Sequence, residues 1–393
     1  MKRISDLERK YVSEALDNEF NTSVNSVFNS RLEAKFSEVL NMKYSIGHVN
    51  GTATLHTALV ALGVKPGDEV IVPPLTMSST SLAVLQAGAI PIFADVDAST
   101  FNISAESIRK CITPKTKAVM TVALYGLAPD YNSIKAVCDQ HNLGLVEDNA
   151  ECFLSKYDGK FVGNFGDFSS FSFQASKHLT CGEGGMLITD DLELANNARR
   201  FSSLGYAGVS AKQGKITRDD IQDPNYSRHV SLGFNYRMSE VCAAVALGQL
   251  ERAEDLVNIR IEVAKMYDEA VKEFASNIRI QHTPSNCVNS YWAYSFALLT
   301  EKPEIDWHAF RTLYKGNGGD GYYAAWKLSY FEPLFLDVIQ SNSGVWQKYE
   351  KGLCINSEYL QPRMVQLKTN YWNLEEAKVQ AEVLNKSLLN FFK

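Results

Sequence analysis

Short apolar segments alternate with amphipathic segments through the first 150 residues, and this alternation limits the fold more than any other feature. The apolar segments have the length of strands and are bounded by turn residues, whereas the segments between them carry apolar residues at helical spacing. We expect strands at 68–74, 90–97, 117–124 and 143–150, and helices at 52–63, 78–88, 105–112 and 132–142. This order predicts an α/β fold with a parallel sheet between two layers of helices.

The rest of the chain predicts a second, smaller domain. Outside the alternating region we expect helices at 1–42, 238–274 and 373–392, strands at 166–173 and 290–299, and a long polar loop at 205–232. The helical pattern at 238–274 is expected to bend or break near Glu254. We therefore expect a large domain at residues 1–254, with an N-terminal helical segment, and a smaller C-terminal domain at residues 255–393.

Charge and cysteine content exclude several classes of function. The net charge is −6, and Lys and Arg do not gather in blocks, so we expect neither a nucleic-acid partner nor an anionic membrane surface. The N-terminus lacks the apolar core of a signal peptide, and no apolar run has the length of a membrane span. The seven cysteines form no CxxC pair and no His cluster has metal-ligand spacing. We expect a cytoplasmic protein with reduced thiols and no metal site.

Polar residues at two element ends are candidates for ligand binding. Ligands of such sheets bind at the carboxyl ends of the strands, and the strand at 143–150 carries Glu147 and Asp148 near its end. A buried carboxylate needs a partner: a protonated pyridine nitrogen, a metal ion, a ribose hydroxyl or an arginine would serve, and a loop or capping role is equally compatible. Gly51 and Thr52 precede a helix, where free N–H groups suit a phosphate as well as an ordinary N-cap.

The stretch SFSFQASKHLTCGEGG, residues 170–185, places Lys177 just before a glycine-rich turn. Glycine permits positive φ and a close approach of backbone to ligand. A lysine becomes nucleophilic when burial or neighbouring cations lower its pKa. The pattern therefore leaves three interpretations open: a solvated lysine beside a turn, a phosphate contact, or an amine that forms a covalent bond.

Several motifs in one order resemble a known family. The stretches are NGTATLHTAL, DEVIVPPLTMSSTSLAVLQAGAIPIFADVD, VEDNAECF, FGDFSSFSFQASKHLTCGEGGMLITDD and LGFNYRMSEVCAAVALGQLERAED. With them the sequence resembles the fold-type I pyridoxal phosphate enzymes and, more narrowly, the DegT/DnrJ/EryC1/StrS group of sugar aminotransferases. The resemblance extends from about residue 5 to the C-terminus and is strongest from 50 to 255. It implies a large domain whose mostly parallel sheet lies between helices, and a smaller C-terminal α+β domain.

The resemblance also assigns roles at the site. It implies that Lys177 forms a Schiff base with pyridoxal 5'-phosphate, and that the freed amine later acts as a general base. Asp148 pairs with the pyridine nitrogen, and Gly51, Thr52 and Ser172 hold the phosphate. One branch of the family carries histidine in place of the lysine and is a dehydratase, so the presence of Lys177 favours an aminotransferase.

Further residues follow from the same resemblance. Glu151 stands where many members carry Gln or Glu near the ring hydroxyl, although a surface acid at the strand exit is the alternative. Asn235 corresponds to an asparagine that reaches the site of the neighbouring subunit, which implies a homodimer with shared active sites. Met77 occupies a position that often carries an aromatic residue stacked on the cofactor, so we expect weaker stacking.

The stretch at 321–333 departs from the pattern of the family, which often has Tyr-Pro and His there. Tyr323, Trp326 and Lys327 would shape a different sugar pocket, although the aromatic residues of this stretch would equally suit a core.

The expected reaction is the transfer of an amino group from L-glutamate to a keto-sugar, most simply a nucleotide-linked one, for surface polysaccharide or lipopolysaccharide (O-antigen) synthesis. Two alternatives remain at this point. The acceptor would be a free sugar, a cyclitol or a sugar-acid aldehyde such as an 8-oxo octulosonate, or the chain would be a regulatory relative without catalysis. A nicotinamide enzyme is disfavoured because no G-x-G-x-x-G motif follows an early strand.

Overall fold

The computed structural model describes residues 2–18, 26–211, 218–341 and 345–393. Its centre is a seven-stranded sheet in the order β1-β9-β8-β5-β4-β2-β3. The strands are β1 (Tyr44–His48), β2 (Glu69–Val72), β3 (Ile90–Phe93), β4 (Thr116–Val122), β5 (Gly144–Asp148), β8 (Phe168–Ser172) and β9 (Gly185–Thr189). The five strands from β3 to β8 run parallel, which confirms the expected α/β fold.

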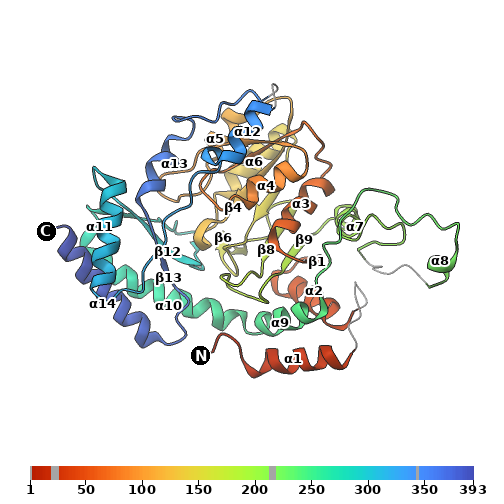
Figure 1. Cartoon of the computed structure of the whole chain (residues 1–393), viewed down its shortest axis with the longest axis horizontal. Helices are drawn as coiled ribbons and strands as arrows, with labels where there is room; N and C mark the ends of the chain where they lie inside the picture. The colour runs from red at the N-terminus through yellow and green to blue at the C-terminus, as the bar shows by residue number, and fades with distance from the viewer. Residues whose placement is uncertain (1, 19–25, 212–217, 342–344) are drawn as a thin grey trace.

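Helices cover both faces of this sheet (Figure 1). Those around it are α1 (Asp6–Asp17), α2 (Val27–Leu40), α3 (Gly51–Ala61), α4 (Ser79–Gln86), α5 (Ala105–Cys111), α6 (Tyr131–His141), α7 (Leu192–Phe201) and α9 (Glu240–Leu250). Val70 and Val72 of β2 pack in one core cluster with α3, α4 and α7, whereas Ile71 between them packs with α5 and α6. Because both faces are buried, residues 70–72 of β2 and the whole of β3 are apolar on both sides.

Two strands of the large sheet were not expected: β9 runs against the others, whereas β1 runs in the same direction as the five parallel strands. β9 pairs antiparallel with β8, and β1 pairs antiparallel with β9. The chain passes from β8 to β9 through the glycine-rich turn without a crossover helix, and a direct return of this kind gives antiparallel strands. The turn closes on itself, because Phe173 N–H donates to the Gly184 carbonyl at 2.8 Å and Cys181 N–H to the Phe173 carbonyl at 3.0 Å.

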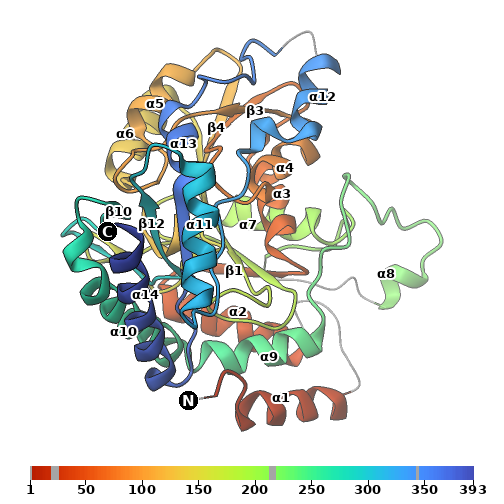
Figure 2. The same ribbon diagram turned by 60° about the vertical axis from the view of Figure 1, so that its left-hand side comes forward.

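A second, three-stranded antiparallel sheet follows a long helix. The helical pattern at 238–274 is interrupted after α9, and α10 (Ala253–Val271) continues it. The small sheet has the order β10-β12-β13, formed by β10 (Ile278–Ile280), β12 (Ala293–Leu298) and β13 (Met364–Lys368). It packs in one cluster with α10, α11 (Pro303–Gly316) and α14 (Leu374–Phe391). Figure 2 shows these three helices side by side.

Part of the C-terminal segment returns to the large sheet. The ring of Phe93 at the end of β3 lies 5.4 Å from that of Tyr330 and 5.0 Å from that of Tyr349. Two helices belong to this return, α12 (Pro333–Ser341) and α13 (Ile355–Leu360), and both views place them beside the large sheet. The division at residue 254 stays a prediction, since these residues share the large core.

The remaining elements are small. β6 (Lys156–Tyr157), β7 (Lys160–Phe161) and β11 (Cys287–Val288) form a minor sheet, and α8 (Arg218–Gln222) lies within the expected loop. Residues 19–25 of the expected N-terminal helix and 212–217 of the expected loop lie outside the described residues. No helix in the described part of the chain is long and apolar enough to cross a membrane.

Candidate active site

The N-terminus of α3 meets the end of β8 at the carboxyl edge of the sheet. Asn50 caps the helix by accepting a hydrogen bond from Ala53 N–H at 2.8 Å. Within the described residues, the N–H groups of Gly51 and Thr52 have no hydrogen-bond partner. A Cβ on Gly51 would lie 2.9 Å from Cβ of Ser172, so only glycine allows this approach. The result is a cluster of free N–H donors with a serine hydroxyl beside it, which suits a phosphate.

The glycine-rich turn fixes this arrangement from the other side. A Cβ on Gly185 would lie 2.7 Å from the carbonyl carbon of Asn50, so β9 touches the start of α3 only because residue 185 has no side chain. Gly182 has φ +88, a left-handed conformation that favours glycine. The glycines thus let the turn fold back beneath α3 and leave Lys177 on the loop that faces the site.

Lys177 is not a solvated lysine. Its side chain is 12% exposed, and its Nζ donates to Oε1 of Glu151 at 3.3 Å. The same amine lies 4.5 Å from the centre of the Trp292 ring. Glu151 is itself buried, so the alternative of a surface acid is wrong for this residue. The amine is therefore placed within the fold by a carboxylate and an aromatic face.

Asp148 lies at the end of β5 and is 4% exposed. It accepts hydrogen bonds from the Thr80 hydroxyl at 2.8 Å and from Ala150 N–H at 3.1 Å. Burial raises the pKa of Asp148 above its ordinary value, while these two hydrogen bonds and the charge of Lys177 oppose the rise. An ionised carboxylate that lacks a full positive partner is suited to receive a cationic ring nitrogen.

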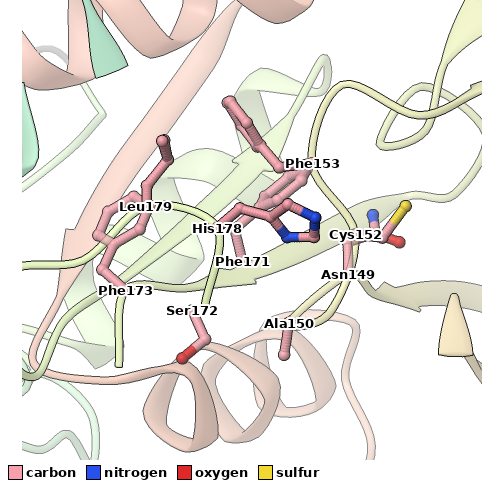
Figure 3. A pocket seen from close by; sticks show the side chains of 9 residues that line it. All are labelled: Asn149, Ala150, Cys152, Phe153, Phe171, Ser172, Phe173, His178 and Leu179. Atoms are coloured by element: carbon pink, nitrogen blue, oxygen red, sulfur yellow. The ribbon is translucent and has the colours of Figure 1, made fainter. Parts of the chain in front are cut away.

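A pocket lies between the exit of β5 and the lysine loop (Figure 3). It encloses about 200 Å³ of space, part of it open to solvent, and its lining residues are Asn149, Ala150, Cys152, Phe153, Phe171, Ser172, Phe173, His178 and Leu179. The ring of His178 points toward Asn149 and Cys152 in this view. Its Nε2 lies 3.1 Å from the Ser290 carbonyl, and burial, with help from the charge of Arg260, lowers the pKa of His178 well below its usual range. His178 is therefore neutral at neutral pH.

The structure does not bring every expected residue to this place. Asn235 is exposed, and its backbone bridges Ser203 rather than the site of its own chain. Met77 is 45% exposed near the start of α4. Tyr323, Trp326 and Lys327 are also exposed, so the core alternative is wrong for these two aromatic residues, although it holds for Tyr322 and Tyr330 of the same stretch, which are buried. The roles of the exposed residues toward cofactor and sugar stay predictions.

Other residues at the site were not expected from the sequence. Tyr125 follows β4, stacks on Trp292 with the ring planes 11° apart, and donates its N–H to Glu151 at 3.3 Å. Because Tyr125 directly follows a strand of the parallel sheet, where ligands bind, the sequence could have identified it as a site residue. Gln366 of β13 donates to the Tyr125 hydroxyl at 3.0 Å and to the Ala324 carbonyl at 2.9 Å. Gln366 thus links the site to the stretch at 321–333.

The donor set matches pyridoxal 5'-phosphate group by group. Free N–H groups of α3 and the Ser172 hydroxyl suit its phosphate, Asp148 suits a protonated ring nitrogen, and Lys177 offers an amine to its aldehyde. Gly51 is a position where a Cβ would fill the space beside Ser172. Among the described residues, no group of three His, Cys, Asp or Glu side chains could hold a metal ion.

Comparisons with known proteins place the chain among enzymes. Residues 2–336 match the model of the DegT/DnrJ/EryC1/StrS aminotransferase family. The chain is 39% identical to the GDP-perosamine synthase of Escherichia coli O157:H7 over 77% of its own length and 78% of that protein. It is 34% identical to the GDP-perosamine synthase of Vibrio cholerae, covering 88% and 92% of the two chains.

A solved structure agrees with this result. The aminotransferase from Psychrobacter cryohalolentis superposes with a TM-score of 0.85 at 26% identity, covering 99% of this chain and 98% of that one. Three observations point to the same family: the order of the motifs in the sequence, the site around Lys177 and the match to the family model. The chain accordingly belongs to the DegT/DnrJ/EryC1/StrS family and is a pyridoxal-phosphate-dependent sugar aminotransferase.

Proposed function

We propose that this enzyme transfers an amino group from L-glutamate to a keto-sugar that is linked to a nucleotide, and that the amino sugar serves surface polysaccharide synthesis. The observation that carries the proposal is the position of the Lys177 amine, held by Glu151 at 3.3 Å in a site that also contains Asp148. Both named relatives are called synthases of a GDP-linked amino sugar, which supports the nucleotide.

The residues of the site divide the work in this proposal. When bound, the cofactor supplies an aldehyde that carries the amino group and a ring that accepts electrons. The N-terminus of α3 and Ser172 would hold its phosphate, and Asp148 would keep the ring nitrogen protonated. Lys177 would hold the cofactor through Nζ and, once freed, take up and return a proton at the same atom. Glu151 orients that amine.

A second copy of the chain would complete the site. Val230, Leu232 and Phe234 expose 57%, 78% and 39% of their area, and Asn235 follows them. Alternating exposed apolar residues are costly in water and are typical of an interface. We therefore propose that this segment packs on the partner and that Asn235 contacts the cofactor phosphate in the partner's site.

Half-reactions test the catalytic proposal. Purified protein incubated with pyridoxal 5'-phosphate should become yellow, and L-glutamate should convert the bound cofactor to its amine form with release of 2-oxoglutarate. The amine form should then react with nucleotide-linked keto-sugars and leave free keto-sugars, cyclitols and sugar-acid aldehydes unchanged. A Lys177→Ala variant should lose the colour and the activity. Colourless wild-type protein, or turnover only with unlinked sugars, would contradict the proposal.

Mixed dimers test the shared site. Lys177→Ala and Asn235→Ala chains are each expected to be inactive or nearly so as homodimers. A mixed dimer has one site of two in which both residues are native, so each mixed dimer formed by co-refolding the two variants should show up to about half of the activity of a wild-type dimer. No recovery on mixing would mean that Asn235 acts within its own chain or not at all.

A further inference from the structure

Trp292 reaches the reactive lysine from the small sheet. It lies directly before β12, yet its ring centre is 4.5 Å from Nζ of Lys177. The indole N–H donates to the carbonyl of Ser176, the residue before the lysine, at 2.9 Å. The side chain thus contacts both the amine and the backbone of the loop that carries it, and the two contacts together fix the ring against Lys177.

The Trp292 ring also lies nearly parallel to a second aromatic ring. The ring of Tyr125 stacks on it at 6.3 Å between centres. Tyr125 has φ +59, a conformation that costs a residue with a side chain about 1 to 2 kcal/mol. It keeps this conformation while its N–H donates to Glu151 and its hydroxyl accepts from Gln366. A strained residue beside a reactive amine is typical of a functional site.

Arg260 of α10 joins Trp292 to Lys177. Its guanidinium donates to the Trp292 carbonyl at 3.0 Å, to the Thr369 hydroxyl at 3.0 Å and to the Lys177 carbonyl at 3.4 Å. Arg260 is 1% exposed and forms no salt bridge with any described carboxylate. A buried cation that is bound only by neutral acceptors lowers the stability of the fold. We therefore infer that Arg260 serves to hold Trp292 and Lys177 in position relative to each other.

We propose that Trp292 is a catalytic residue: its indole face and the Glu151 carboxylate stabilise the ammonium form of Lys177 while that amine carries a proton. Nζ takes one proton from a carbon atom of the reacting molecule, holds it as ammonium, and releases it to a second atom, so that no proton is gained or lost. Arg260 is the positioning residue for Trp292. This inference rests on the role proposed above for Lys177.

The contact between the Lys177 amine and the Trp292 ring sets the size of the expected effects. A cation over an aromatic face gains stability that corresponds to about a threefold to thirtyfold preference for the charged form. Removing the ring should therefore leave more neutral amine in the resting protein and, at the same time, make the amine a weaker base. The first effect accelerates reaction with an aldehyde, and the second slows removal of a proton from carbon.

Labelling of cofactor-free protein tests the first effect. Formaldehyde with cyanoborohydride modifies free amines, and mass spectrometry of the peptide that contains Lys177 gives its rate. Trp292→Leu should label about threefold to thirtyfold faster than wild type at neutral pH, whereas Trp292→Phe, which keeps a ring, should stay near wild type. Glu151→Gln should also label faster. Because this change hardly alters the shape of the site, faster labelling would come from the lost charge and not from easier entry of the reagent.

The glutamate half-reaction tests the second effect. Trp292→Leu should lower its rate about threefold to thirtyfold with little change in KM, and glutamate deuterated at the α-carbon should show a larger isotope effect than in wild type. Trp307→Phe is the matched control, because Trp307 also donates its indole N–H to a carbonyl, that of Met364, at 2.7 Å. It should change neither measurement.

The outcomes separate this inference from the proposed function. If wild type fails to react with glutamate, the proposed function fails, while labelling still reports on Trp292. If Trp292→Leu does not fold, replacing all five tryptophans by a fluorinated analogue of the same shape and a weaker π face allows the same labelling experiment. Labelling within twofold of wild type for the ring-deficient or fluorinated protein would overturn the inference.

Discussion

Glu147 and Asp148 are neighbours on β5, and the fold uses their two carboxylates in opposite ways. The Glu147 carboxylate accepts five hydrogen bonds at 2.7–3.3 Å, from the N–H groups of Gly163, Phe165 and Gly166, the Ser169 hydroxyl and the Asn149 amide. Among the described residues, the Asp148 carboxylate accepts only from the Thr80 hydroxyl and Ala150 N–H. Successive side chains of a strand point to opposite faces of the sheet. Glu147 therefore binds the loop at 163–166 on one face, while Asp148 faces the site on the other.

The environment of Asp148 predicts that its ionised carboxylate lowers the stability of the cofactor-free fold but strengthens cofactor binding. Burial raises the pKa of Asp148, so its ionised form destabilises the cofactor-free fold once the pH exceeds the unfolded value. Asp148→Asn should therefore leave the melting temperature of cofactor-free protein at pH 7 unchanged or higher. It should weaken cofactor binding at least tenfold and reduce the half-reaction by about a hundredfold or more. Thermal unfolding with and without cofactor measures the first two effects, and a less stable variant with normal cofactor binding would contradict the argument.

Glu147→Gln should have the opposite profile. The amide replaces one acceptor oxygen by a donor that faces backbone N–H groups, so we expect a loss of about 3 kcal/mol in the free energy of unfolding. Activity per folded molecule should stay within about threefold of wild type, because Glu147 faces away from the site. Urea unfolding and active-site titration measure the two quantities. Full stability together with lost activity would show that Glu147 acts in catalysis.

Two glycines of the same turn predict different effects on phosphate binding. Gly185→Ala would place a Cβ 2.7 Å from the Asn50 carbonyl carbon and 2.9 Å from the Gly51 nitrogen, so the start of α3 must move. Cofactor affinity should fall at least tenfold, as should the affinity for competing inorganic phosphate. Gly182→Ala is the control: no atom of the described residues lies within 4 Å of the added Cβ, and only the φ of +88 is unfavourable, at about 1 to 2 kcal/mol. Equal losses of affinity would refute this account.

The sequence predicts most of the large domain because its pattern is local. Apolar strands alternate with amphipathic helices between residues 52 and 150, and each of those elements lies within a few residues of its expected bounds, whereas α7, β6 and β7 were not expected. β1 and β9 escape this method, since both are short and β9 directly follows the glycine turn. Lys177 could be predicted from the sequence because it lies in the same short motif, residues 170–185, as the glycines of the turn. Trp292 and Arg260 could not, because only tertiary packing brings α10 and β12 to the lysine.

His48 predicts how stability depends on pH. It is fully buried, and burial lowers its pKa to about 4, with a smaller lowering from Arg199. The unfolded chain takes up a proton near pH 6.5, but the folded chain does so only near pH 4. Stability is therefore fully present above pH 6.5 and decreases as the pH falls, by about 3 kcal/mol in total for this residue.

A variant isolates this contribution. Asn at position 48 can still donate to the Ile46 carbonyl, which now lies 2.9 Å from Nδ1 of His48, but it does not titrate. His48→Asn should be no more stable than wild type at pH 7, yet its stability should decrease less between pH 7 and 4.5, by about 2 to 3 kcal/mol. Urea unfolding of cofactor-free protein at both pH values measures the difference. His141→Gln, a change at an exposed position, should parallel wild type, and a His48→Asn curve that also parallels it would mean that His48 is protonated without cost to the fold.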